Sequence, residues 1–107
     1  MRLVKGAYVE PPAVALPWGR PTDDAYAALA HQLCNAGADV ALATHDAALR
    51  ARLLAELPNV RCELLLGIRP ADAVALAATG RDTRIYVPYG PDWLRYFLRR
   101  RAESQGA

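Results

Sequence analysis

The sequence predicts an α/β fold built on a parallel sheet, and three observations carry this prediction. Short apolar runs suited to strands alternate four times with amphipathic stretches suited to helices. The expected strands start near positions 2, 39, 61 and 83, so the last two intervals are 22 residues each, the length of one compact strand–helix unit. The runs are almost continuously apolar, as in Leu64–Leu66 and Ile85–Val87, which is typical of parallel strands covered by helices.

The first unit combines a short strand, a long loop and a helix. The strand is expected over Arg2–Tyr8, and the prolines from Pro11 to Pro21 then mark a loop that cannot be regular structure. Thr22 is suited to cap the following helix at its N-terminus, and Gly37 is suited to end it.

Three further units follow in the same order. Their expected elements are a strand over Asp39–Ala43 with a helix capped by Asp46, a strand over Arg61–Leu66 with a helix that Pro70 opens and Gly80 closes, and a strand over Thr83–Val87 with a helix from Gly90-Pro91-Asp92 to about Glu103.

The length allows one domain, spanning residues 1–107. A complete (β/α)₈ barrel takes about 250 residues, so four units amount to well under half of one. A sheet of four parallel strands also leaves two open edges, which a soluble protein must cover. We therefore expect the chain to be a piece of a larger barrel, either as a fragment of a longer protein or as a natural truncation.

The composition is that of a folded soluble protein, with 53% hydrophobic and 22% charged residues. A net charge of +2 is too small to indicate nucleic acid or a membrane surface as a partner. No apolar run is long enough to cross a bilayer and no secretory signal opens the chain, so we expect a cytoplasmic protein. Cys34 and Cys62 fit no zinc or CxxC spacing, so we expect buried reduced thiols and no metal site.

Polar and glycine residues gather where the strands are expected to end. In parallel α/β proteins ligands bind at this edge of the sheet. The segments are Lys5–Tyr8, Thr44–Asp46, Gly67–Arg69 and Tyr86–Gly90. Such a rim suggests a phosphate-bearing cofactor, although many barrels carry one.

Two polar residues near the expected strands have more than one interpretation. Arg2 and Lys5 leave opposite faces of the first strand, so Arg2 either points into a barrel or is a surface charge at a strand start. His45 follows a strand and precedes a helix cap, where it is either a loop residue bonded to backbone or a catalytic base. His31 lies in the middle of a helix and is expected to be structural.

The last helix carries the sharpest local feature. Tyr96, Arg99 and Arg100 project from one side because they are three or four positions apart. Two guanidinium groups beside a phenol could bind a small carboxylate, but a basic helix end favoured by the helix dipole needs no ligand. The opposite side is expected to pack against the protein through Leu94, Phe97 and Leu98.

Four motifs, taken in order, resemble one family. They are Arg2–Glu10 (RLVKGAYVE), Ala43–Asp46 (ATHD), Glu63–Arg69 (ELLLGIR) and Tyr86–Arg100 (YVPYG, DW and YFLRR). They are similar to strands five to eight and the last helix of the FAD-dependent proline dehydrogenases, and the match covers nearly the whole chain. The resemblance implies the C-terminal half of a distorted (β/α)₈ barrel. Strands one to four of the family, with a lysine and an aspartate of its site, lie outside the match, and Arg95 stands where many members have proline.

The resemblance also implies a reaction. Members oxidise L-proline to Δ1-pyrroline-5-carboxylate, passing a hydride from the ring carbon beside nitrogen to N5 of FAD. The electrons then go to a quinone, which would bring the protein to the periphery of the inner face of the membrane.

Individual roles follow from the matched motifs. Arg2 would lie near the reactive flavin edge as an active-site residue. The FAD contacts would be Lys5, Gly6, Ala7, Thr44 and His45. The proline carboxylate would be held by Arg99 and Arg100, and Tyr86 and Tyr96 would shape the substrate pocket.

Two other functions compete with this one. A non-catalytic half-barrel could associate with itself or with a partner to cover its open edges. A different phosphate-binding barrel enzyme, such as an aldolase-like one, would give Arg99 and Arg100 no role in substrate binding.

Overall fold

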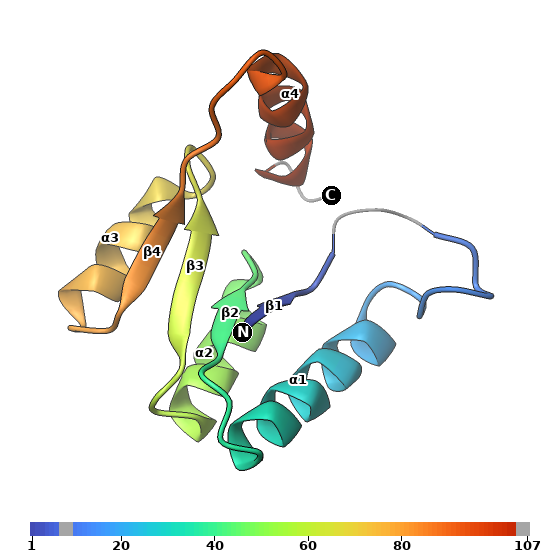
Figure 1. Ribbon diagram of the computed structural model, residues 1–107, viewed down its shortest axis with the longest axis vertical. Coiled ribbons are helices and arrows are strands. Elements are labelled where there is room, and N and C mark those ends of the chain that lie inside the picture. The colour runs from blue at the N-terminus through green and yellow to red at the C-terminus, as the bar shows by residue number, and fades with distance from the viewer. Residues whose placement is uncertain (7–9, 105–107) are drawn as a thin grey trace.

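The computed structural model describes residues 1–6 and 10–104, with the side chains of residues 100 and 102–104 outside that description. Four parallel strands form one sheet in the order β1-β2-β3-β4 (Figure 1). The strands are β1 (Arg2–Val4), β2 (Ala41–Ala43), β3 (Arg61–Leu65) and β4 (Thr83–Tyr86). The helices are α1 (Arg20–Asn35), α2 (Ala47–Glu56), α3 (Pro70–Ala78) and α4 (Trp93–Ser104). The α/β class and its parallel sheet are confirmed.

The strands are shorter than the apolar runs that predicted them. The run at Asp39–Ala43 yields a strand only from Ala41, yet Val40 is 2% exposed. Burial extends beyond the ladder because the connecting segments also pack into the core, so hydrophobicity alone overestimates strand length. Residues 7–9 of the first predicted strand lie outside the described part of the chain.

The first helix begins earlier than predicted. Its N-cap is Gly19, with Pro21 in the first turn, and the Thr22 hydroxyl donates instead to the carbonyl of Pro17 at 2.7 Å. Proline is well tolerated in a first turn, where its missing N–H would have no helical acceptor. The prediction that Thr22 caps this helix is therefore wrong, because Pro21 belongs to the helix and not to the loop.

One face of the sheet packs against α1 and α2. Leu3 of β1 and Leu42 of β2 join Leu53 and the small residues of α1 in the core, where Ala30 is completely buried. The Tyr26 hydroxyl donates to the carbonyl of Leu3 at 2.8 Å. Burial raises the pKa of this phenol, so Tyr26 stays neutral and α1 stays fastened to β1.

The opposite face of β1, β3 and β4 carries polar and aromatic side chains. Alternation along each strand sends Arg2, Glu63 and Tyr86 to this side, away from the buried Leu3 and Leu64. Figure 1 shows α4 beyond the carboxyl ends of β3 and β4, apart from the other helices. We call this side of the sheet, with α4 at its end, the polar face.

The apolar side of α4 does not pack as predicted. Leu94 is 51% exposed, Phe97 52% and Leu98 57%. Apolar side chains of a helix become buried only where another segment covers them. Within the described residues no segment covers this side of α4, so these side chains remain at the surface.

Both cysteines are free, as predicted. The predicted burial is confirmed for Cys62 and is wrong for Cys34, which is partly exposed near the end of α1. Burial raises the pKa of the Cys62 thiol, which favours its protonated form. Within the described residues, no helix is long and apolar enough to span a bilayer. The same residues contain no group of three or more His, Cys, Asp or Glu side chains placed to hold a metal ion.

Candidate active site

The carboxyl ends of the four strands meet at one edge of the sheet. Every strand pair is parallel, so the segments that follow the strands emerge on the same side, toward α4 (Figure 1). Lys5 follows β1, Thr44 follows β2, Leu66 follows β3 and Val87 follows β4. The fold therefore brings together the four segments in which the sequence placed ligand-binding residues.

Two carboxylates hold the side chain of Lys5. Its Nζ lies 2.6 Å from Oδ1 of Asp23 and 2.8 Å from Oδ2 of Asp46. Burial disfavours the ammonium, but hydrogen bonds to the two carboxylates and their charges outweigh it and raise the pKa of Lys5. Lys5 thus fastens the end of β1 to the first turn of α1 and to the cap of α2.

Gly6 turns the chain away from β1. Its φ of +93° lies in a region that side-chain-bearing residues rarely adopt. An added Cβ would meet no atom within 4 Å, so the requirement is conformational and not steric. Ala7, the next predicted ligand contact, lies outside the described residues.

The loop after β2 is tightly fixed. Thr44 is 5% exposed, and its Oγ1 accepts a hydrogen bond from the Asp46 N–H at 3.2 Å. The predicted cap is confirmed, because Oδ1 of Asp46 accepts from the Leu49 N–H at 3.0 Å. Nε2 of His45 accepts from the Leu65 N–H at 3.1 Å, which requires the lone pair of a neutral ring. His45 is therefore a loop residue bonded to backbone, and its second nitrogen carries the proton.

Arg2 reaches across the polar face of the sheet. Its Nε donates to Oε2 of Glu63, two strands away, and its guanidinium carbon lies 6.0 Å from the centroid of the Tyr86 ring. Ala41 and Ala43 of the intervening β2 are small enough to leave this path open. Arg2 therefore lies across the polar face of the sheet with its side chain 54% exposed, and its position inside a barrel stays a prediction.

Two aromatic rings in contact connect the sheet to α4. The Tyr86 and Tyr96 rings lie with their centroids 5.8 Å apart and tilted by 46°. Tyr96 is half-buried, and helical spacing places Arg99 and Arg100 about one turn further along from it. The side chain of Arg99 is exposed, whereas that of Arg100 is outside the described part of the structure.

Glu63 belongs to this site and was not among the predicted site residues. Its side chain is 12% exposed and pairs with Arg2. The available signal was alternation: a carboxylate at a position that faces away from the helix-packed core, in an otherwise apolar strand, needs a partner on that face.

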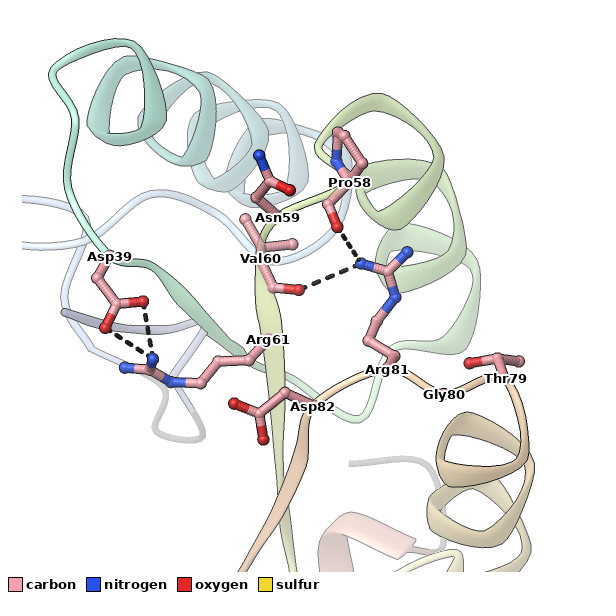
Figure 2. Close-up of a pocket in the computed structure, with 9 residues that line it drawn as sticks. All are labelled: Asp39, Pro58, Asn59, Val60, Arg61, Thr79, Gly80, Arg81 and Asp82. Carbon is pink, nitrogen blue, oxygen red and sulfur yellow. Dashed lines mark hydrogen bonds and ion pairs between the residues drawn. The ribbon is translucent and has the colours of Figure 1, made fainter.

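A cavity of about 420 Å³ opens at the other, amino-terminal edge of the sheet (Figure 2). There Arg61 contacts both carboxylate oxygens of Asp39 at 2.7 Å. Arg81 donates to the carbonyls of Pro58 at 2.9 Å and Val60 at 3.2 Å. Arg61 thus joins the start of β3 to the segment before β2, and Arg81 joins the segment before β4 to the loop after α2. At this edge of a parallel sheet such contacts serve stability.

Comparison with known proteins gives one consistent family. The family model for proline dehydrogenase matches residues 1–107. The chain is 46% identical to proline dehydrogenase 1 of Bacillus subtilis strain 168 over 110 residues, which covers 96% of this chain and 36% of the relative. It is 40% identical to the proline dehydrogenase of Deinococcus radiodurans over 115 residues, covering 97% of this chain and 36% of that protein. The chain thus spans about a third of the length of these relatives.

Proposed function

The chain belongs to the proline dehydrogenase family, and we propose that it forms the FAD- and substrate-binding part of an enzyme that oxidises L-proline to Δ1-pyrroline-5-carboxylate. One observation carries the proposal: Arg2, Tyr86 and Tyr96 meet on the polar face, beside the strand ends, in a chain that matches the family along its whole length. A cation and two aromatic rings on the inner side of a parallel sheet suit a planar ligand that gains charge.

The sheet is proposed to be the C-terminal half of a (β/α)₈ barrel, with β1 to β4 as strands five to eight. The sequential strand order supports this, as does the packing of α1 and α2 on the same face of the sheet. In a barrel the other face lines the interior, which is where Arg2 and Glu63 point. The matched segment is 36% of the length of the relatives, so the remaining units come from outside it.

FAD is proposed to bind at Arg2 and at the segments that follow the strands. Bound FAD would supply the hydride acceptor, N5 of its ring system. Arg2 is the residue proposed to lie beside that edge, and its half-exposed guanidinium can reach a ligand while it pairs with Glu63. The backbone of Lys5 and Gly6 would contact the cofactor, together with Ala7.

The loop after β2 supplies the other proposed FAD contacts. Thr44 and His45 are held by hydrogen bonds within the chain, so the loop is ordered before a ligand arrives. Such preorganisation spares a ligand the entropy of ordering the loop. His45 contributes a neutral ring there and, because it accepts from Leu65, is not proposed as the catalytic base.

The substrate is proposed to lie between α4 and the sheet. Arg99 and Arg100 would hold the proline carboxylate, since a guanidinium matches a carboxylate with two parallel hydrogen bonds. Tyr86 and Tyr96 would form the wall of the pocket. Fixing the carboxylate at one end would orient the ring carbon beside nitrogen toward a bound flavin, so that binding energy is used for correct geometry.

The electron acceptor and location are proposed by the same family relationship. A quinone would reoxidise the flavin, and the protein would be cytoplasmic and peripheral to the inner face of the membrane.

A second function is favoured by a separate observation. The apolar side of α4 is exposed, and β1 and β4 are the open edges of the sheet. A half-barrel that associates with itself to cover these surfaces would need neither FAD nor proline.

A segment exchange tests the proposal. This chain replaces the matched segment of Bacillus subtilis proline dehydrogenase 1, and the purified protein, called here the exchanged protein, is examined for flavin absorbance. We expect FAD to co-purify near one per chain and Arg2→Met to lower its affinity, with Arg52→Met on the outer helix α2 as a matched control. A folded exchanged protein without flavin would contradict the proposal, and dimers of that flavin-free protein would favour the second function.

A further inference from the structure

Glu63 is the nearest acidic partner that the structure gives Arg2. Its carboxylate accepts from Arg2 Nε, and the contact joins β1 to β3 across two alanines of β2. The Glu63 side chain is 12% exposed, whereas that of Arg2 is 54% exposed. The Glu63 carboxylate is therefore largely shielded from solvent on the polar face, whereas the Arg2 guanidinium is half exposed to solvent.

The negative charge of Glu63 modifies the electrostatic potential that Arg2 creates. A buried or half-buried charge acts over several ångströms, because few water molecules screen it. The Glu63 carboxylate weakens the positive electrostatic potential that Arg2 creates on the polar face, next to the Tyr86 ring. Arg84, opposite Glu63 in the β3–β4 ladder, pairs with Asp82 at 3.7 Å, so it has a carboxylate of its own.

The reduction of the proposed cofactor changes its charge by one unit. A hydride brings two electrons and one proton, so FAD accepts it with a gain of one negative charge and proline loses the same hydride. A cation near the flavin edge stabilises the reduced form more than the oxidised form, and an anion does the opposite.

We propose that Glu63 is a positioning residue that orients Arg2 over the polar face and, by offsetting its charge, lowers the reduction potential of the bound flavin. This inference rests on the proposed function, because it requires FAD beside Arg2. A purely structural alternative exists, in which the pair only clasps β1 to β3. That alternative affects stability and leaves the potential of a bound flavin where it is.

Two variants separate orientation from charge. In Glu63→Gln the amide oxygen can still accept from Arg2, so orientation is kept and the negative charge is lost. In Glu63→Ala both are lost. The matched control is Asp82→Asn, which makes the same charge change at an exposed carboxylate of the opposite edge of the sheet.

The first measurement is the reduction potential of flavin in the exchanged protein. For Glu63→Gln we expect the affinity for reduced FAD relative to oxidised FAD to rise about tenfold, a shift of about +30 mV for a two-electron couple. Asp82→Asn should leave the potential unchanged. Equal potentials in wild type and Glu63→Gln, both with FAD bound, would overturn the role of Glu63 and leave the proposed function standing.

The second measurement needs no flavin. In the 107-residue chain the Arg2 Nε–H should exchange slowly with solvent in wild type and Glu63→Gln, and much faster in Glu63→Ala, as followed by ¹⁵N NMR. Equal exchange in all three would overturn the orienting role. If the exchanged protein holds no FAD in any form, the proposed function fails and the effect on potential fails with it.

Discussion

At the scale of single residues, a local contact such as a helix cap could be predicted from the sequence, whereas an ion pair between residues far apart in the sequence could not. Asp46 was predicted as a helix cap from its position alone, and the structure confirms it. Glu63 was missed because its partner, Arg2, lies 61 positions away in the sequence. Local rules such as capping act within one turn and can be read from neighbouring residues, whereas a cross-strand ion pair depends on register.

The proposed carboxylate site yields a prediction for Arg100. In the exchanged protein, Arg100→Ala should raise KM for proline about 10- to 100-fold, because the charge-assisted hydrogen bonding of one guanidinium, worth about 1.5–3 kcal/mol, is lost. The FAD content should stay close to that of the unsubstituted protein. Steady-state kinetics over a range of proline concentrations measures the effect, with Arg101→Ala as a control of equal charge. An unchanged KM would remove Arg100 from the substrate site.

At the scale of helices and loops, the structure shows a buried network that the sequence pattern did not suggest. Arg50 of α2 is 5% exposed; its Nη1 donates to the Thr44 carbonyl at 3.0 Å and its Nη2 to Asp72 of α3 at 2.9 Å. Asp72 also accepts from Arg69 at 3.1 Å. The helical pattern identified only the leucines of α2, since an arginine in a helix is usually solvated. Its burial follows from where α3 places Asp72.

Removing the two hydrogen bonds of the Arg50 guanidinium should destabilise the chain strongly. Arg50→Met leaves the Thr44 carbonyl and part of Asp72 without a donor, so we expect the free energy of unfolding to fall by about 3 kcal/mol. Urea denaturation measures this. Arg52→Met, which removes only an exposed pair with Glu56 on the same helix, should cost no more than about 0.5 kcal/mol. An equal decrease in the free energy of unfolding in the two variants would show that the buried Arg50 contacts stabilise the chain no more than the exposed Arg52 pair does.

A pH dependence follows from the cap of α2. The hydrogen bond from Leu49, then the contact with Lys5, lowers the pKa of Asp46. A carboxylate whose pKa is lowered on folding contributes stability above its unfolded value near 4, and that stability is lost as pH falls through the folded value. Asp46→Asn keeps a good cap without a titrating group.

The variant should therefore be less stable than wild type at neutral pH and lose less stability on acidification from about pH 5 to pH 2. Chemical denaturation at a series of pH values measures both quantities. Parallel stability curves for the two proteins would mean that Asp46 is not responsible for the acid sensitivity.

At the scale of the whole molecule, the parallel order of the strands was predicted and the environment of α4 was not. The repeat of strand and helix is encoded in each unit, so it could be read without knowing the tertiary structure. The packing of Leu94, Phe97 and Leu98 depends on what lies beyond the four units, and the described residues leave them half exposed. A hydrophobic stripe predicts that a helix face packs against other residues, but it does not identify the segment that covers it.

This exposed stripe predicts behaviour of the isolated chain. The 107-residue chain should self-associate in a concentration-dependent manner through the apolar side of α4. Phe97→Gln combined with Leu98→Gln should shift it toward monomer, while Val74→Gln on α3, at a residue 70% exposed, should not. Sedimentation velocity across a concentration series distinguishes them. A monomeric wild-type chain at all concentrations would contradict this prediction.

The central claim is that the polar face and the carboxyl ends of these strands bind FAD and proline together. The most direct measurement is anaerobic addition of L-proline to the exchanged protein while its flavin absorbance is followed. Bleaching of the flavin band by L-proline, much weaker at the same concentration in the Arg99→Ala variant, is the result we predict. A protein that holds FAD but shows no bleaching at any proline concentration would contradict the claim.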